Sequence, residues 1–427
     1  MVPSNRSESF KGNLLKISVS RMLVLGGEQL AFPFFSLYVL ELGGSLSTIA
    51  LINSIASIAS VLAAPVGGYI ADSKGRVKLL FFGTLGFSLS SIFFILAQNW
   101  VALAVGVFIQ MLTRMYMPAL NAILADSTSV GKRGRESALS DTITTCPSIF
   151  APALIGFVAD KLSITYAVKL GFCGLLVLSF VSACIRLSLK DTIVSDTKDT
   201  TLRDIPSLVY NSYEKLFSLL RGGVGNLKMI AVVCALVALL NGTTGPYWIV
   251  YATEVIRLTP GEWGIIISVQ SLLRVLCLVP AGFLSDKIGS KTVILVSLVP
   301  LPLCSMCFIG SQSFTSTLAA LVGITACSTL IAPASFTLFV NSTVRRSRGS
   351  AVAAIGRGSM GLVMGTTIFG GEGLLLLPAK LIGYHVGNLL YQSNRPYPWL
   401  LLSMGLVLVL VLNAVFIDEP KIAKESG

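Results

Sequence analysis

Apolar residues in this chain gather in long blocks that short polar stretches separate. Residues 81–97 and 399–417, for example, contain no Asp, Glu, Lys or Arg. An α-helix needs about 20 predominantly apolar residues to cross the hydrocarbon core of a bilayer. The pattern predicts twelve membrane crossings, at residues 14–40, 47–71, 79–97, 100–125, 137–160, 165–187, 227–252, 262–285, 292–311, 314–340, 350–372 and 396–417.

The composition indicates the same class of protein. Hydrophobic residues make up 54% of the chain and charged residues 12%, with a mean hydropathy of +0.81. Soluble domains carry about 25% charged residues, so the composition excludes a globular enzyme with one membrane anchor. No small-residue cleavage site follows the first apolar block, which we interpret as a retained helix and not as a signal peptide. We expect an all-α membrane protein.

The net charge of +12 comes mainly from loops on one side of the predicted membrane. Lys and Arg cluster in every second loop, as at 74–78, 132–135, 287–291 and 345–348. The loops on the opposite side hold only Lys161, Lys169, Arg257, Lys380 and Arg395. Because loops rich in Lys and Arg stay in the cytoplasm, we expect a multi-pass protein of the cell membrane with both termini cytoplasmic. The alternation indicates a lipid bilayer as the partner of these charges, and not nucleic acid.

A polar stretch in the middle of the chain divides it into two parts. Hydropathy falls between residues 189 and 226, where acidic and basic residues crowd together. We therefore predict a six-helix bundle at 1–190, a cytoplasmic linker at 191–225 and a second six-helix bundle at 226–427. Within the linker, residues 205–220 have apolar side chains at helical spacing, which is typical of a helix that lies on the membrane surface.

The two predicted bundles repeat one another in sequence. A set of three residues recurs at a spacing of 214. Gly68, Asp72 and Gly75 precede the third crossing, and Gly282, Asp286 and Gly289 precede the ninth. A second match, at 213 residues, pairs 33–41 with 246–254 and includes Tyr38 and Tyr251. Two matches at nearly one spacing indicate a duplicated six-helix unit, an arrangement common among transporters.

The segment 68–78, between the second and third crossings, carries a recognisable motif. Its residues Gly68, Asp72, Gly75 and Arg76 resemble the signature loop of the major facilitator superfamily, and the copy at 282–291 resembles the weaker repeat of that loop. The topology of the whole chain is also similar to that family. The resemblance implies two pseudo-symmetric six-helix bundles, secondary transport by alternating access, and a charge cluster that holds the halves together on the cytoplasmic side.

The residues of this loop have a physical logic of their own. Gly68 is expected to let another helix approach closely, and Gly75 to permit a sharp turn. Arg76 is expected to pair with a carboxylate, for which Asp126 at the end of the fourth crossing is the candidate. In the second half Ser290 and Asn341 stand in place of these two charges, so we expect the first cluster to be the stronger. The alternative is a solvated loop that only obeys the positive-inside rule.

Three charged residues lie far inside the predicted crossings. Glu28 follows Lys16 by 12 residues, and Arg114 and Arg274 precede Asp126 and Asp286 by 12 residues. At 1.5 Å per residue each lies roughly 18 Å from the cytoplasmic end, near the midplane. A charge at this depth costs about 2.5–3.5 kcal/mol on insertion scales, which makes all three candidates for substrate binding or proton coupling.

The resemblance implies that the first, fourth, seventh and tenth crossings line a central cavity. Glu28 and Arg114 are then expected to face each other, with Arg274 approaching from the other half. We interpret Glu28 as a carboxylate that alternates between an arginine partner and a proton; the alternative is a static buried pair that orients helices. Two arginines against one glutamate favour an anionic substrate.

Two further features remain open from sequence. Tyr38 and Tyr251 occupy equivalent positions, where they either close the outer mouth over the substrate or belong to an interfacial aromatic belt. In the eleventh crossing Gly349 and Pro378 lie farther apart than their counterparts in the fifth. The insertion, at about 369–378, is either an unwound helix segment or an external extension of the helix, which we prefer.

The leading hypothesis is a monomeric, proton-coupled transporter of a small solute. Multidrug or lipophile efflux by proton antiport is the alternative within transport. A lipid scramblase or a membrane-embedded enzyme is the alternative from another class. The sequence has no nucleotide-binding glycine loop, no metal-ligand cluster and no paired catalytic carboxylates in a loop, so we expect no enzyme activity, no metal and no cofactor.

Overall fold

The computed structural model describes residues 5–128, 133–191, 214, 225–342 and 373–419. Within these ranges the chain is helical and has no strand. Eleven stretches are long and apolar enough to cross a membrane, and they confirm eleven of the twelve predicted crossings with ends within three residues. The predicted crossing at 350–372 and the predicted surface helix at 205–220 lie outside the described residues, apart from Glu214.

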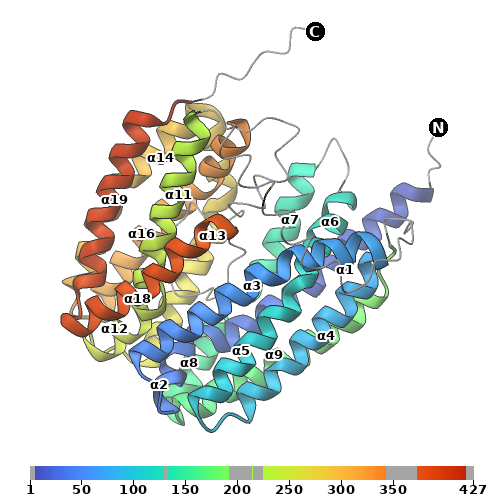
Figure 1. Ribbon diagram of the computed structural model, residues 1–427, viewed down its shortest axis with the longest axis horizontal. Coiled ribbons are helices and arrows are strands. Elements are labelled where there is room, and N and C mark those ends of the chain that lie inside the picture. Colours follow the sequence, from blue (N-terminus) through green and yellow to red (C-terminus); the bar gives the residue numbers. More distant parts are fainter. Residues whose placement is uncertain (1–4, 129–132, 192–213, 215–224, 343–372, 420–427) are drawn as a thin grey trace. The chain divides into compact units, whose positions relative to one another are not determined.

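The helices form two compact units (Figure 1). Unit 1 comprises residues 1–212 and 259–271, and unit 2 comprises 213–258 and 272–427. Unit 1 contains α1 (Asn5–Ala31), η1 (Phe32–Phe34), α2 (Phe35–Glu41), α3 (Leu46–Lys74), α4 (Arg76–Ile95), α5 (Trp100–Thr113), η2 (Arg114–Tyr116), α6 (Met117–Asp126), α7 (Arg133–Thr145), η3 (Cys146–Ile149), α8 (Ala151–Lys161) and α9 (Ile164–Leu187). In this bundle α9 packs against both α1 and α4.

Unit 2 has a corresponding series of helices. They are α11 (Gly225–Thr244), η5 (Gly245–Tyr247), α12 (Trp248–Glu254), α13 (Pro260–Ile288), α14 (Ser290–Leu298), α15 (Pro300–Ile309), α16 (Phe314–Asn341), η7 (Leu374–Leu376), α18 (Leu377–Ser393) and α19 (Tyr397–Phe416). The first part of α13, to Ser271, belongs to unit 1. In unit 2, α11 packs against α18 and α19, and α14 packs against α16.

The backbone repeats where the sequence repeats. α3 and α13 both run for 29 residues and end at a glycine with positive φ, 93° at Gly75 and 91° at Gly289. The segments that follow each begin directly after that glycine, as α4 and α14. Only glycine adopts such backbone angles without strain, so both motif glycines are explained by the turn that they make.

Proline and polar caps account for most of the helix boundaries. Pro33 and Pro246, at equivalent positions, each open a 3₁₀ turn within a longer crossing. Proline has no N–H to donate and therefore interrupts the α-helical hydrogen-bond ladder. Ser45, Asn99 and Ser163 each accept a backbone N–H at the start of a crossing, which satisfies a donor that the helix itself leaves unpaired.

One segment that the sequence placed in an outer loop is helical. Residues 377–393 form α18, and Lys380, expected among the outer-loop charges, is 6% exposed inside unit 2. The helix crosses α11 closely, since a Cβ at Gly387 would lie 2.2 Å from the backbone oxygen of Thr243. Glycines allow two helix backbones to meet in this way. Of the insertion at about 369–378, residues 369–372 lie outside the described residues, and residues 374–378 form η7 and the start of α18. Whether the rest of the insertion is unwound stays a prediction.

Candidate transport site

Glu28 and Arg114 form an ion pair inside unit 1. A guanidinium nitrogen of Arg114, in η2, donates to the Oε1 oxygen of Glu28, in α1. The two side chains are 17% and 15% exposed, and the Arg114 guanidinium lies 5.2 Å from the centre of the buried Phe87 ring. The sequence predicted that these residues face each other, and the structure brings them together.

Arg114 occupies a break in the fourth crossing. Because Pro118 has no N–H, it cannot donate to the carbonyl of Arg114 four residues earlier. The N–H of Met117 bonds to that carbonyl instead, which produces the 3₁₀ turn η2. A 3₁₀ stretch inside a longer helix often marks a functional hinge or a strained segment. The turn carries Arg114 at its first position.

The neighbouring helices provide room for this break through glycines. A Cβ at Gly67 in α3 would lie 1.7 Å from the carbonyl oxygen of Met115, the middle residue of η2. A Cβ at Gly83 in α4 would lie 2.8 Å from the Cβ of Tyr116. The close approach that we expected at Gly68 is therefore one residue earlier. A Cβ at Gly68 itself would meet no described atom within 4 Å.

Arg274, the third charge predicted at the midplane, belongs to unit 2. It lies in α13 and is half-buried. Among the residues that the structure describes, Arg274 has no hydrogen bond and no ion pair. A part for Arg274 in binding substrate stays a prediction.

Tyr38 and Tyr251 are buried within their own units and make the same kind of bond. Tyr38 donates 2.7 Å to the carbonyl oxygen of Phe94, and Tyr251 donates 3.2 Å to that of Ile309. Each bond joins the first crossing of its unit to the C-terminal end of the third, and aromatic rings pack against both phenols. These contacts hold each bundle together, and a gating role for either tyrosine stays a prediction.

The motif loop in unit 1 contains the predicted ion pair. Arg76 donates 2.6 Å to the Oδ2 oxygen of Asp126, and the two side chains are 12% and 46% exposed. The side chain of Asp72 lies outside the described residues. In unit 2, a Cβ at Gly282 would meet no described atom within 4 Å, and the exposed Asp286 makes no hydrogen bond or ion pair with a described residue. Among the residues that can be compared, the motif loop of unit 1 therefore makes an ion pair that its copy in unit 2 lacks.

Two acidic residues that the sequence analysis did not single out also hold these loops. Asp191, after α9, accepts hydrogen bonds from the backbone N–H groups of Arg76 at 3.1 Å and Val77 at 3.4 Å. Glu419, after α19, accepts one from Ser290 at 2.6 Å. Each carboxylate meets the unpaired N–H groups and positive dipole at a helix start. Their signal in the sequence is a carboxylate just after the last crossing of each half.

The described residues contain no group of three or more His, Cys, Asp or Glu side chains that could hold a metal ion. The site chemistry available in the described part of the chain is therefore that of single charges, ion pairs and hydroxyl groups. Such groups bind and release solutes and protons.

The sequence model of the family described as "Major Facilitator Superfamily" matches residues 17–222 and 230–427. The chain belongs to this superfamily. It is accordingly a multi-pass membrane transporter of a small solute, and it is not an enzyme.

Known relatives and structures agree with this family. The multidrug resistance protein MdtG of Yersinia enterocolitica is 26% identical over 345 residues, which cover 76% of this chain and 78% of that protein. MdtG of Proteus mirabilis is 32% identical over 189 residues, so this chain matches only 46% of its length. The crystal structure of a D-xylose-proton symporter has the same fold, with a TM-score of 0.71 and 14% identity over 96% of this chain and 98% of that one.

Proposed function

We propose that this transporter exports small organic molecules in exchange for protons, and that Glu28 carries the proton. The observation on which the proposal depends is the Glu28–Arg114 ion pair inside unit 1. Intramembrane carboxylates with a cationic partner are typical of proton relays in transporters. Export is favoured because the relatives in Yersinia and Proteus bear the name of multidrug resistance proteins.

The electrostatics of the pair link protons to substrate. With Glu28 ionised the pair is neutral, and with Glu28 protonated the site carries the full charge of Arg114. A cationic substrate is repelled by the protonated form and accepted by the neutral form, so cation and proton bind in alternation. Binding that excludes one partner when the other is present is the thermodynamic basis of exchange.

The cycle that we propose is alternating access between the two bundles. In it the Arg76–Asp126 pair helps to close the cytoplasmic side, with both termini in the cytoplasm of a monomer in the cell membrane. The pair stands beside the turn at Gly75, which Asp191 also contacts from the end of α9. These contacts lie within unit 1, where they keep the loop in shape on the side that the proposal makes cytoplasmic.

A second candidate is transport of an organic anion together with protons. Arg274 favours it, because this cation has no carboxylate partner among the residues that the structure describes. Protonation of Glu28 also releases Arg114, which then attracts an anionic group. The sign of the substrate charge thus decides whether protons and substrate move in opposite directions or together.

Purified protein in proteoliposomes tests both candidates. Uptake of a lipophilic cation and of an organic anion is measured with and without an imposed pH gradient. We expect Glu28→Gln to abolish accumulation that the gradient drives while exchange of substrate for substrate survives, since exchange needs no net protonation change. Glu41→Gln, which alters another carboxylate on the same crossing, is the matched control. If well-folded Glu28→Gln still concentrates either substrate, Glu28 is structural and proton coupling lies elsewhere.

A further inference from the structure

Arg186 is a second buried cation of unit 1, and the proposed coupling pair does not include it. It lies in the last turn of α9 and is 1% exposed. Its Nε donates 3.4 Å to Ser20, another nitrogen donates to the hydroxyl of Thr84, and no carboxylate pairs with it in the described part of the chain. The carbonyl end of α9 favours a cation. Neutral partners still make this an expensive side chain to bury.

The guanidinium of Arg186 lies over the face of a tyrosine ring. The distance to the centre of the Tyr116 ring is 4.8 Å, and Tyr116 is itself 2% exposed. A cation over an aromatic face is attracted to it, and the attraction grows when water is absent. Tyr116 is the last residue of η2, the three-residue turn that begins with Arg114. Arg186 therefore holds one end of the turn whose other end reaches Glu28.

The equivalent crossing of unit 2, α16, has no counterpart of the Arg186–Tyr116 contact among the described residues. Pro333 stands where the repeat places Pro118, yet α16 continues unbroken from Phe314 to Asn341. Thr329 stands in place of Arg114 in that helix, and its hydroxyl donates 2.7 Å to the carbonyl of Thr325 in its own backbone. A proline alone therefore does not produce the turn.

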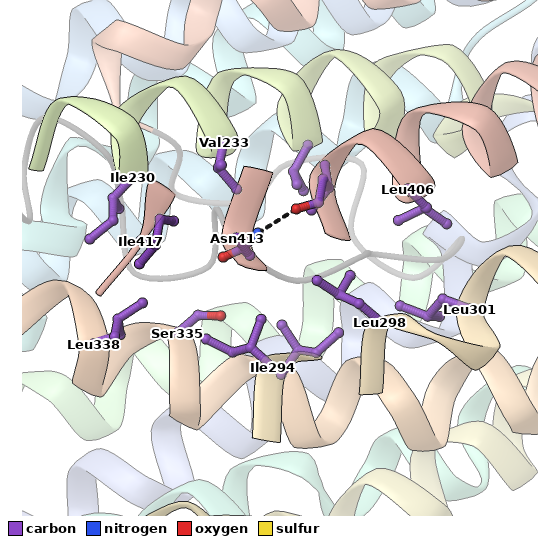
Figure 2. A pocket seen from close by; sticks show the side chains of 13 residues that line it. Ile230, Val233, Ile294, Leu298, Leu301, Ser335, Leu338, Leu406, Asn413 and Ile417 are labelled. Atoms are coloured by element: carbon purple, nitrogen blue, oxygen red, sulfur yellow. Dashed lines mark hydrogen bonds between the residues drawn. The ribbon is translucent and has the colours of Figure 1, made fainter. Parts of the chain in front are cut away.

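The residues around Arg186 are replaced together in unit 2. Counting by the repeat, Val233, Leu298 and Ile331 stand in place of Ser20, Thr84 and Tyr116. All three line a small cavity of about 30 Å³ in that bundle, to which the end of α19 contributes Asn413 and Ile417. Figure 2 shows this aliphatic lining, in which the Asn413 amide turns to the carbonyl of Val409 at 2.8 Å.

The glycines that make room for the turn η2 are also present in unit 1 and absent from the equivalent positions of unit 2. Ala281 and Ser297 occupy the positions that correspond to Gly67 and Gly83. Cation, hydroxyl partners, tyrosine and glycines are thus present together where the crossing is broken and absent together where it is continuous. This joint change connects Arg186 with the geometry of the turn.

We propose that Arg186 is a positioning residue, which holds Tyr116 and thereby the turn η2 so that Arg114 reaches Glu28. The inference rests on the proposed function in one respect only, namely that the Glu28–Arg114 pair carries the coupled proton. The position of Arg114 is a property of unit 1 alone. Arg186 itself touches neither substrate nor proton in this proposal.

Labelling of Glu28 with a hydrophobic carbodiimide tests the position of Arg114 without measuring transport. The reagent adds to a protonated carboxyl group in an apolar site, and an arginine partner protects the carboxylate from it. Labelling is quantified by mass spectrometry of the peptide that contains Glu28, at one fixed pH, with Arg114→Ala as the reference for full loss of the pair. We expect low labelling of the unchanged protein and a rise of roughly fivefold or more in Arg186→Met, the factor by which about 1 kcal/mol changes a population.

Companion variants separate positioning from general damage. Arg186→Lys keeps the charge without the planar guanidinium and should give an intermediate value. Lys380→Met removes another buried cation that lies over a tyrosine, 5.7 Å from the Tyr384 ring in unit 2, and should leave Glu28 labelling unchanged. In the double variant with Arg114→Ala, Arg186→Met should add nothing, since both act on the same contact.

The outcomes distinguish this inference from the proposed function. Folded Arg186→Met with unchanged Glu28 labelling, beside a strongly labelled Arg114→Ala, overturns the positioning role. Should Arg186→Met fail to fold, Tyr116→Leu and Arg186→Lys must raise the labelling, and unchanged labelling in both overturns the inference equally. Raised labelling together with undisturbed pH-driven transport supports the positioning role and refutes proton coupling through Glu28.

Discussion

Replacing Gly67 by alanine should disturb the turn η2 directly. The new Cβ would lie 1.7 Å from the carbonyl oxygen of Met115 and 2.6 Å from its carbonyl carbon. To restore an ordinary contact of about 3.5 Å, the two backbones must separate by roughly 1.8 Å. Both atoms belong to the backbone, so no side chain can rotate out of the way. Overpacking of this kind costs about 1–3 kcal/mol.

Gly68→Ala is the matched control for this substitution. It adds the same methyl group to the same helix, where no described atom lies within 4 Å. Alanine favours a helix over glycine by about 1 kcal/mol in both variants, so the comparison cancels that gain. The remaining difference of about 1–3 kcal/mol corresponds to a melting temperature about 2–12 °C lower for Gly67→Ala in a unit of this size.

Thermal unfolding in detergent at a single scan rate measures this difference, because membrane protein unfolding is commonly irreversible. Carbodiimide labelling of Glu28 on the same samples reports whether Arg114 has moved with Met115. We expect Gly67→Ala to melt lower and to label more strongly than Gly68→Ala. Equal melting temperatures and equal labelling of the two variants would refute the close contact between α3 and η2 and with it the account of the turn.

Three further results are expected. Asp126→Asn should impair transport more than Asp286→Asn at matched expression, because Asp126 pairs with an arginine and Asp286 makes no ion pair with a described residue; equal losses would contradict this. Tyr38→Phe should lower stability by about 0.5–1.5 kcal/mol, and Tyr251→Phe in the same direction, as thermal unfolding would record. Asp72→Asn should shift the protein toward inward-facing forms, and unchanged cysteine accessibility from each side of the membrane would argue against a cytoplasmic lock.

Much of the site could be predicted because membrane burial makes charges rare. Glu28 and Arg114 were paired from their equal depth and from the family resemblance, which places their crossings around one cavity. Arg76 and Asp126 were paired from a loop motif and a helix end. Arg186 was overlooked because it lies one residue from the end of its helix, where a cation is ordinary. Its burial depends on Ser20, Thr84 and Tyr116, which are distant in sequence. No local pattern reveals such a set.

The sequence by itself determined the crossings, their duplication and the membrane class, since each depends on the length and polarity of local segments. The turn at Gly75 and its copy at Gly289 were likewise legible, because positive φ selects glycine. Only the tertiary structure decided that residues 377–393 form a helix with Lys380 buried, that the close contact falls on Gly67 and not Gly68, and that Pro118 breaks its helix while Pro333 does not. In each case the outcome depends on what a neighbouring helix presents, and that is a property of packing and not of the segment.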